Sequence, residues 1–220
     1  MNLKDLRIDG ARLQSSIEES AKIGKTENNG LMRCAATDED KVGRDLLMKW
    51  YKECGCEITI DEMGNMFARR PGKNPELGAV ITGSHFDTQR PGGRFDGILG
   101  VLGALEVMRI INENNIELER DLIIVNWTNE EGGWFIPACM VSGVWVGNHT
   151  KEWAYSIKDR DGNTVFGEEL ERIGYKGTFP ASHKEWNIYG AFELHIEQGP
   201  VLEKEKLNIG APKGILCLHW

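Results

Sequence analysis

Four short stretches of the sequence carry histidine or carboxylate side chains in patterns that suit metal binding. The first, GSHFDTQ, contains His85 and Asp87 at alternate positions, so on an extended chain both side chains point to the same face. A metal-binding imidazole usually has its other ring nitrogen held by a carboxylate or a carbonyl, and Asp87 is placed for that task. The alternative is a capping aspartate beside a histidine whose hydrogen bonds are satisfied within the fold.

The second stretch, GGRFDG, places Asp96 between glycines. Glycine allows a tight turn that brings a carboxylate close to a cation, and one carboxylate can bridge two metal ions. The alternative is an ordinary turn aspartate before a helix. Considered alone, this stretch favours the ordinary turn.

The third stretch, NWTNEEGG, contains the adjacent carboxylates Glu130 and Glu131. Adjacent side chains face different directions, which permits a division of labour. One carboxylate can ligate a metal, while the other takes a proton from a water molecule as the general base. The alternative is a pair of acids that faces solvent at the end of a strand.

The fourth stretch, HIEQGP, supplies His195 after an apolar segment. Glu197 and Gln198 follow it and are available for orientation or for hydrogen bonds to a substrate. Each of the four signals is weak to moderate alone. Together they provide histidine, aspartate, glutamate and histidine at the edge of one predicted sheet, which is the ligand set that a two-metal hydrolase requires.

The elements predicted around these stretches form a parallel βαβ unit. AVITGS (79–84) and DLIIVNW (121–127) are apolar runs typical of covered strands, and the apolar spacing over 97–115 predicts the helix between them. AFELHI (191–196) is predicted as a third apolar strand. In open α/β sheets ligands bind at the carboxyl ends of the strands, so we expect the four stretches to meet there.

Periodicity and turn signals predict the remaining elements. They are a helix over 3–23, a helix from Thr37 to about Glu53, a hairpin of strands CEITID (56–61) and MFAR (66–69), and short helices beginning near Lys151 and Gly167.

Composition favours a globular protein that acts on small molecules. Of 220 residues, 40% are hydrophobic and 27% charged, as in average soluble domains, and apolar runs fall short of the roughly 20 residues that span a membrane. The net charge of −8 without a lysine and arginine cluster argues against nucleic-acid binding. The amino terminus lacks the features of a signal peptide, and five cysteines without framework spacing suit reduced thiols, so we expect a cytoplasmic protein.

The stretches GSHFDTQ, GGRFDGILGVLGALEV, NEEG and FELHIEQGPVLE, in this order, resemble zinc amidohydrolases that cleave N-carbamoyl amino acids. The similarity is greatest to the β-ureidopropionase (β-alanine synthase) and N-carbamoyl-L-amino-acid hydrolase branch of the aminoacylase and carboxypeptidase clan. The resemblance implies a three-layer αβα catalytic domain of the zinc-exopeptidase type, with a smaller domain inserted for dimerisation and closure.

The resemblance also implies a role for each residue. His85 and His195 would bind one metal ion, Asp96 would bridge to a second ion held by Glu131, and Glu130 would be the base. The implied cofactors are two divalent ions, with zinc implied by the family. Histidine and carboxylate ligands also suit manganese, cobalt or nickel.

Two further residues receive roles. Asp87 is a catalytic candidate that supports the metal ligands, and Gln198 is a candidate substrate contact. The implied reaction converts N-carbamoyl amino acids, or N-carbamoyl-β-alanine, to the amino acid, carbon dioxide and ammonia, in a family of homodimers. The alternatives are an allantoate amidohydrolase, an aminoacylase, or a non-catalytic remnant that folds partly, binds metal weakly, or pairs with a partner that supplies the second half.

The sequence also departs from the family pattern. Residues 1–210 resemble the N-terminal part of the catalytic domain, whereas 211–220 is a truncated or divergent junction to the dimerisation domain. The last metal-ligating histidine and the arginine that receives the substrate carboxylate do not appear, so we expect little activity from this chain alone. NEEGGWF replaces the NEEGxRF of the family pattern, so Trp134 lies beside the expected arginine position or displaces the arginine.

Overall fold

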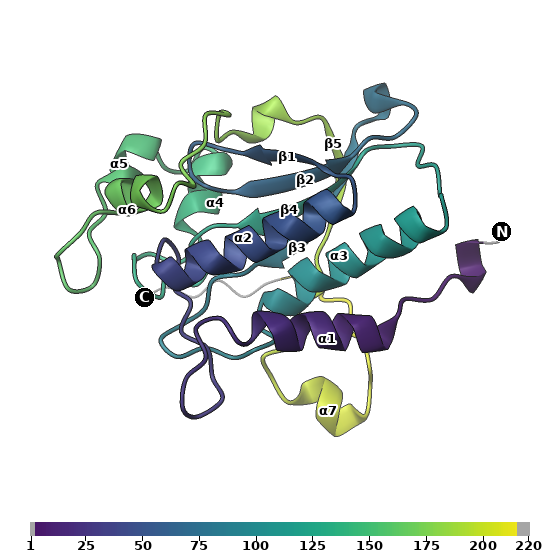
Figure 1. The fold of residues 1–220 in the computed structure, drawn as a ribbon, viewed down its shortest axis with the longest axis horizontal. Helices are drawn as coiled ribbons and strands as arrows, with labels where there is room; N and C mark the ends of the chain where they lie inside the picture. Colours follow the sequence, from purple (N-terminus) through teal and green to yellow (C-terminus); the bar gives the residue numbers. More distant parts are fainter. Residues whose placement is uncertain (1–2, 215–220) are drawn as a thin grey trace.

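A parallel βαβ unit forms the centre of the sheet, as the sequence predicts (Figure 1). In this computed structural model, which describes residues 3–214, β3 (Ala79–His85) and β4 (Leu122–Trp127) pair in parallel and α3 (Ile98–Glu113) connects them. The apolar runs of both strands are largely buried because each strand has a neighbour on either side. The α/β fold class is therefore confirmed.

The five strands form one mixed sheet in the order β1-β2-β4-β3-β5. β1 (Glu57–Ile60) and β2 (Met66–Arg70) make the predicted hairpin, and β2 also pairs antiparallel with β4. β5 (Ile188–Phe192) pairs in parallel with β3. The three parallel strands β4, β3 and β5 therefore end at the same edge of the sheet.

Helices surround this sheet and complete the chain order. They are α1 (Gly10–Ser20), α2 (Asp38–Glu53), α4 (Met140–Trp145), α5 (Lys151–Tyr155), α6 (Phe166–Arg172) and α7 (Val201–Glu205), with 3₁₀ turns at Leu3–Asp5, Pro75–Leu77 and His183–Glu185. The predicted starts of α5 and α6 are confirmed to within a residue, whereas α4 was not predicted. α1 is shorter than the predicted helix over 3–23, since Asp9 caps its first turn by accepting a hydrogen bond from the Arg12 amide.

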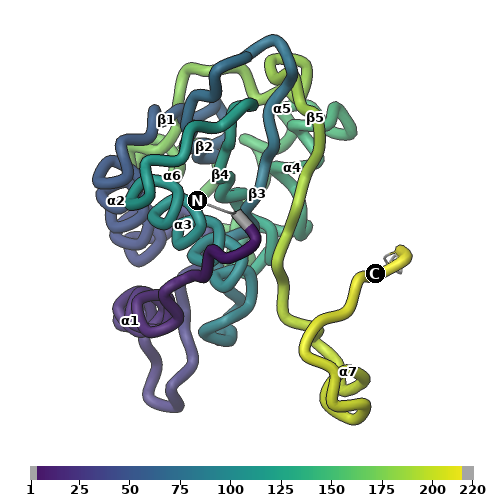
Figure 2. Tube along the Cα trace, turned by 90° about the vertical axis from the view of Figure 1, so that its right-hand side faces the viewer, coloured from purple at the N-terminus to yellow at the C-terminus, as the bar shows by residue number. Residues whose placement is uncertain are grey.

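The two faces of the sheet bury separate apolar clusters. Figure 2 shows α1, α2 and α3 together on one side of the sheet, where residues such as Leu47 and Leu105 belong to the larger core. On the other face, Phe67 and Val125 pack in a smaller cluster with Trp145 of α4. The sheet is thus the middle layer between helices.

The third apolar strand differs from the prediction in place and in burial. β5 begins three residues earlier than AFELHI and ends at Phe192, whose side chain is 71% exposed. Among the described residues, β5 pairs with β3 alone, so it is an edge strand without packing on both sides. An apolar sequence was therefore not sufficient to predict burial of this strand. The segment after β5, including α7, extends away from the sheet (Figure 2).

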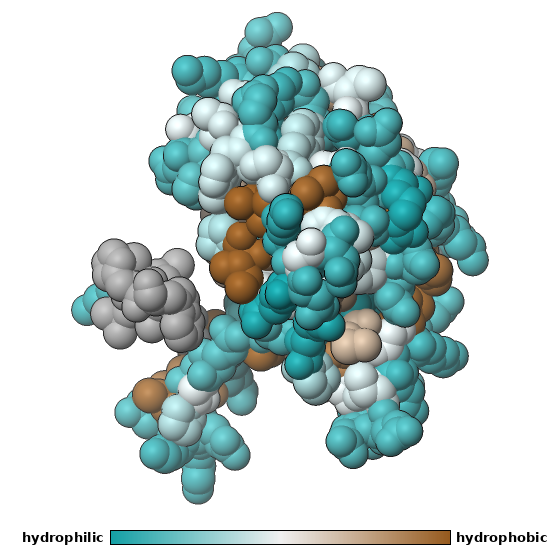
Figure 3. Space-filling model, turned by 90° about the vertical axis from the view of Figure 1, so that its left-hand side faces the viewer, coloured by the Kyte–Doolittle hydropathy of each residue, from teal (hydrophilic) through white to brown (hydrophobic). Residues whose placement is uncertain are grey.

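The face drawn in Figure 3 is mostly hydrophilic and carries a hydrophobic patch. Within residues 3–214, no helix has the length and apolar character needed to cross a membrane. The last six residues of the predicted junction, 215–220, lie outside the described residues.

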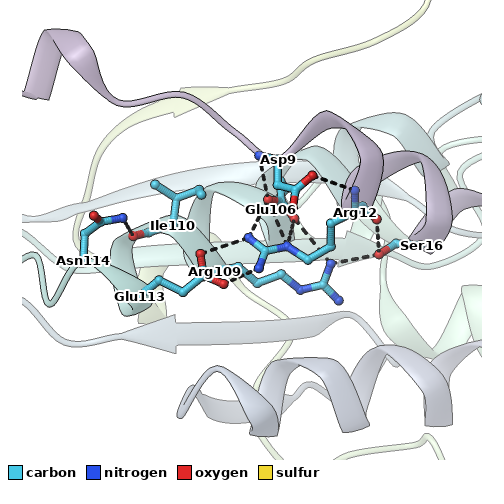
Figure 4. Close-up of polar contacts among 8 residues, drawn as sticks. All are labelled: Asp9, Arg12, Ser16, Glu106, Arg109, Ile110, Glu113 and Asn114. Carbon is cyan, nitrogen blue, oxygen red and sulfur yellow. Dashed lines mark hydrogen bonds and ion pairs between the residues drawn. The ribbon is translucent and has the colours of Figure 1, made fainter.

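A buried glutamate joins α1 to α3 (Figure 4). The fully buried side chain of Glu106 accepts hydrogen bonds from the guanidinium of Arg12, at 2.7 to 3.2 Å, and from the backbone amide of Asp9. Arg109 approaches the second carboxylate oxygen at 3.4 Å. The same Arg12 also contacts Glu113, which is half exposed.

Replacing Glu106 by glutamine is expected to lower the free energy of unfolding by about 2–3 kcal/mol, because it leaves two arginines beside a buried neutral amide. This loss of unfolding free energy is smaller than that expected on breaking a fully buried ion pair, since the Arg12 side chain is 30% exposed. Urea denaturation followed by circular dichroism measures it. Glu113→Gln is the matched control, because Glu113 contacts the same arginine in solvent and its loss is expected to matter much less. Equal effects from the two variants would contradict the assignment.

Candidate metal centre

The four predicted stretches meet at one edge of the sheet. His85 is the last residue of β3, and Asp96 lies just before α3. Glu130 follows the end of β4 by three residues, and His195 follows the end of β5 by three. The parallel arrangement of these strands therefore brings together side chains that are more than a hundred positions apart in the chain.

His85, Asp96 and His195 form a cluster that could hold a metal ion. The Oδ1 atom of Asp96 lies 3.2 Å from His195 Nε2 and 3.8 Å from His85 Nε2, and all three atoms lie within 4.8 Å of one another. Four ligands at zinc-to-nitrogen and zinc-to-oxygen distances of about 2.0–2.2 Å stand roughly 3.3–3.5 Å apart in a tetrahedron. The spacing of the three side chains is close to that of a metal's ligand shell.

The hydrogen bonds around the cluster leave electron pairs that face one another. The Nδ1 atoms of His85 and His195 lie 2.9 Å from the carbonyl oxygens of Asp87 and Ile196, so each Nδ1 carries the hydrogen and donates it. In the neutral rings, each Nε2 then presents a lone pair. The buried Asp96 Oδ1 between them accepts no hydrogen bond from the residues described. In these neutral rings the three acceptors repel one another, and a proton or a metal cation between them would relieve the repulsion, so the donor set fits a metal.

Gly97 allows the His85 ring to occupy its place. Its backbone is left-handed, with φ of +65°, and a Cβ atom added there would lie 2.3 Å from His85 Nε2. The ring thus lies directly against the α-carbon of the residue after Asp96. The glycine in GGRFDG therefore has a packing reason as well as a conformational one.

Asp87 lies behind the cluster and organises the backbone after β4. Its carboxylate oxygens accept hydrogen bonds from the backbone amides of Glu130, at 3.3 Å, and Glu131, at 3.2 Å. The support for the ring of His85 comes from the backbone carbonyl of Asp87, whereas the sequence had suggested its carboxylate. Burial raises the pKa of Asp87 to about 7.

The two adjacent glutamates point to different partners. Glu130 Oε2 lies 3.4 Å from His85 Nε2, whereas Glu131 Oε2 accepts a hydrogen bond from Gln89 Nε2 at 3.0 Å. Burial raises the pKa of Glu131. Burial alone would lower the pKa of His85, but the nearby charges of Asp87 and Glu130 raise it above the ordinary value.

Gln198 reaches the cluster through its side-chain amide, which donates a hydrogen bond to Asp96 Oδ2 at 2.6 Å. The residue has a left-handed backbone, with φ of +55°. This contact supports the orienting role that the sequence left open beside substrate binding. Gln198 thereby holds Oδ2 of Asp96, while Oδ1 lies near the imidazoles of His85 and His195.

Two further histidines of the described residues, His149 and His183, lie outside the cluster. His149 stacks on Trp153, with ring centres 4.4 Å apart, and His183 Nδ1 lies 3.3 Å from the carbonyl oxygen of Trp145. Both are packing residues. His219 and Cys217 lie outside the described part of the chain.

Two residues that contact the glutamates were not found from the sequence. Gln89 donates to the carbonyl and to the carboxylate of Glu131, and the Cys139 thiol donates to Glu130 Oε1 at 3.4 Å. Gln89 was visible as the last letter of GSHFDTQ, two positions beyond Asp87. Cys139 had no local signal, since its contact depends on the path of the loop between β4 and α4.

Fold and site together define an α/β enzyme class that carries a possible metal centre at the carboxyl ends of parallel strands. Residues 80–211 match the peptidase family M20/M25/M40, and the chain belongs to this family. The resemblance found in the sequence motifs is therefore confirmed at the level of the family.

Named relatives and solved structures agree with this placement. The N-carbamoyl-L-amino-acid amidohydrolase of Rhizobium meliloti is 45% identical over 214 residues, which are 97% of this chain and 51% of the relative. A ureidoglycolate hydrolase of Oryza sativa subsp. japonica is 34% identical, over 94% of this chain and 44% of the relative. A hydantoinase/carbamoylase family amidase from Burkholderia multivorans superposes with a TM-score of 0.87 at 53% identity, covering 91% of this chain and 48% of that one.

These comparisons support a hydrolase by family resemblance. The chain spans about half the length of the relatives that it matches. Residues 80–211 include His85, Asp96 and His195, the three residues of the cluster.

Proposed function

We propose that this chain supplies the metal centre and the general base of an amidohydrolase that cleaves N-carbamoyl amino acids to the amino acid, carbon dioxide and ammonia. The observation that carries the proposal is the convergence of three unshared electron pairs, from His85, Asp96 and His195, with the carboxylate of Glu130 at 3.4 Å from one of the rings. A metal-binding cluster beside a free carboxylate is the arrangement that activates water for hydrolysis.

The cluster and Glu131 would hold two divalent ions. His85, His195, Asp96 and Glu131 would hold these ions, most simply as zinc. The backbone amides of Glu130 and Glu131 donate hydrogen bonds to the Asp87 carboxylate, and Gln89 donates one to Glu131, so these contacts fix the directions of the two glutamates. Such supporting contacts typically change metal affinity by about 10- to 100-fold.

Glu130 would move the proton. Bound ions would polarise the ureido carbonyl and favour deprotonation of the attacking water. Glu130 takes that proton through the carboxylate oxygen nearest the cluster and returns it to the leaving nitrogen. Its side chain is suited to this task because it is neither deeply buried nor engaged by an arginine or lysine among the residues described.

The substrate class rests on what the relatives share. N-carbamoyl amino acids and ureidoglycolate both contain a ureido group, and relatives named for each are similar to this chain along most of its length. We therefore favour a ureido substrate over an N-acyl amino acid. The higher identity to the Rhizobium meliloti enzyme favours the N-carbamoyl amino acid, with ureidoglycolate and allantoate as rivals.

A substrate panel tests the proposal. Purified chain and a fusion of residues 1–214 to the unmatched half of the Rhizobium meliloti relative are loaded with Zn²⁺ or Mn²⁺ and assayed for ammonia or amino-acid release. The panel contains N-carbamoyl-L-amino acids, N-carbamoyl-β-alanine, allantoate, ureidoglycolate and N-acetyl amino acids. We expect the fusion to prefer N-carbamoyl amino acids and the chain alone to release little product.

The contrary results are distinct. A folded, metal-loaded fusion that hydrolyses none of the panel would overturn the proposal, and a preference for N-acetyl substrates would replace it by an aminoacylase. Strong hydrolysis by the 220-residue chain alone would contradict only the expected low activity.

A further inference from the structure

Cys139 contacts the glutamate that faces the candidate metal centre. Its thiol donates to Glu130 Oε1 at 3.4 Å, while the other carboxylate oxygen, Oε2, lies 3.4 Å from His85 Nε2. The two oxygens of one carboxylate thus have different neighbours. One is held by sulfur, and the other faces the cluster.

The backbone fixes the position of this thiol. The amide of Cys139 donates to the carbonyl of Glu130 at 2.7 Å, and the side-chain amide of Asn129 donates to the carbonyls of Phe135 and Pro137 within the same loop. Cys139 itself has a left-handed backbone, with φ of +54°, just before α4. Because these bonds join backbone groups and Asn129, the loop keeps its shape when the thiol is changed.

We propose that Cys139 is a positioning residue that holds the Glu130 carboxylate so that its free oxygen faces the metal centre. The inference rests on the proposed function for the role of Glu130 as base, but the contact itself does not. Without a donor at Oε1, the partly exposed Glu130 side chain can rotate into solvent, and proton transfer requires it to return.

The chemical state of the sulfur suits a donor. Burial, followed by the charge of Glu130, raises the pKa of the Cys139 thiol to about 12, so the sulfur keeps its proton at neutral pH. A protonated thiol is a weak hydrogen-bond donor and a poor nucleophile. This state favours positioning over covalent catalysis, and it predicts slow reaction with electrophiles.

The contact is tested without any assay of hydrolysis. The rate at which iodoacetamide alkylates Cys139 is measured against pH by mass spectrometry of its peptide, in chelator-treated wild-type protein and in Glu130→Gln. Removing the carboxylate charge is expected to accelerate alkylation at pH 8 several-fold, since more thiolate forms. Glu168→Gln, at an exposed position of α6, is the matched control. Equal rates in wild type, Glu130→Gln and the control would overturn the contact.

The positioning role is tested on the fusion protein used for the substrate panel. Cys139→Ala is expected to lower kcat about two- to tenfold with little change in KM, as loss of one modest hydrogen bond predicts. Cys139→Ser is expected to restore kcat, because a hydroxyl donates at the same place.

The outcomes separate the two proposals. Unchanged kcat in Cys139→Ala, or a serine variant as slow as the alanine variant, would overturn the positioning role. If the wild-type fusion hydrolyses nothing, the proposed function fails, and the alkylation rates still decide whether Cys139 and Glu130 are in contact.

Discussion

Glu130→Gln is expected to lower the turnover of N-carbamoyl amino acids by about 10²–10⁴-fold, the contribution typical of a positioned general base. The amide keeps the shape of the side chain but cannot accept the proton of the attacking water. In the wild-type protein, Glu130 Oε2 lies 3.4 Å from His85 Nε2, so this carboxylate faces the cluster. The substitution leaves the three residues of the cluster, His85, Asp96 and His195, unchanged. Steady-state rates of ammonia release by the fusion protein measure the effect.

Metal content distinguishes a lost base from a lost ligand. Glu130→Gln is expected to retain its metal, measured by atomic emission after dialysis, whereas Glu131→Gln is expected to lose part of it. Glu130 and Glu131 have the same side chain, and both backbone amides donate hydrogen bonds to Asp87, so the two variants form a matched pair. Loss of metal in the Glu130 variant with retention in the Glu131 variant would reverse the assigned roles.

The central elements were predictable because their signals are local. Thr37 caps α2 through a side-chain hydrogen bond to the Asp40 amide, and three acids occupy the first turn, so the start of that helix follows from adjacent residues. The apolar runs of β3 and β4 are long enough to indicate covered strands. The parallel pairing then follows from the helix between them.

The edge strand β5 and the helix α4 were harder to predict from local sequence signals. β5 is apolar in sequence yet exposed, because burial depends on a neighbour and the described sheet provides one on a single side. α4 has six residues, too few to display a helical period, and begins after a cysteine that makes no capping side-chain bond.

One part of the candidate site could likewise be predicted from the sequence, and another part could not. Residue types at strand ends were sufficient to select His85 and His195, since parallel strands share one edge, and Asp96 was selected in the glycine-rich turn before α3. The contacts that hold these side chains could not be predicted from residue types, because they join loops that are far apart along the chain. The bond from Gln198 to Asp96 joins residues 102 positions apart, and the thiol on Glu130 depends on a loop path that no periodicity describes.

Gly97→Ala is expected to abolish tight metal binding at the cluster. An alanine Cβ would lie 2.3–2.4 Å from three atoms of the His85 ring, and the left-handed backbone at this position is strained for any residue with a side chain. The overlap is expected to displace the His85 ring and so to move Nε2 from its place beside Asp96. Isothermal titration with Zn²⁺ measures the loss of affinity, which is expected to exceed about 100-fold, beyond the effect of losing a supporting contact.

Gly93→Ala in the same loop provides the control. A Cβ there would meet no described atom within 4 Å, and Gly93 does not have the left-handed backbone found at Gly97. Both variants reduce the conformational freedom of the unfolded loop by the same amount, so a difference between them reports on the overlap with the His85 ring and on the left-handed backbone at residue 97. Circular dichroism separates loss of the site from loss of the fold. If a folded Gly97→Ala protein binds Zn²⁺ as tightly as Gly93→Ala, then His85 Nε2 is not a ligand, and the metal centre has to be built from the carboxylates and His195.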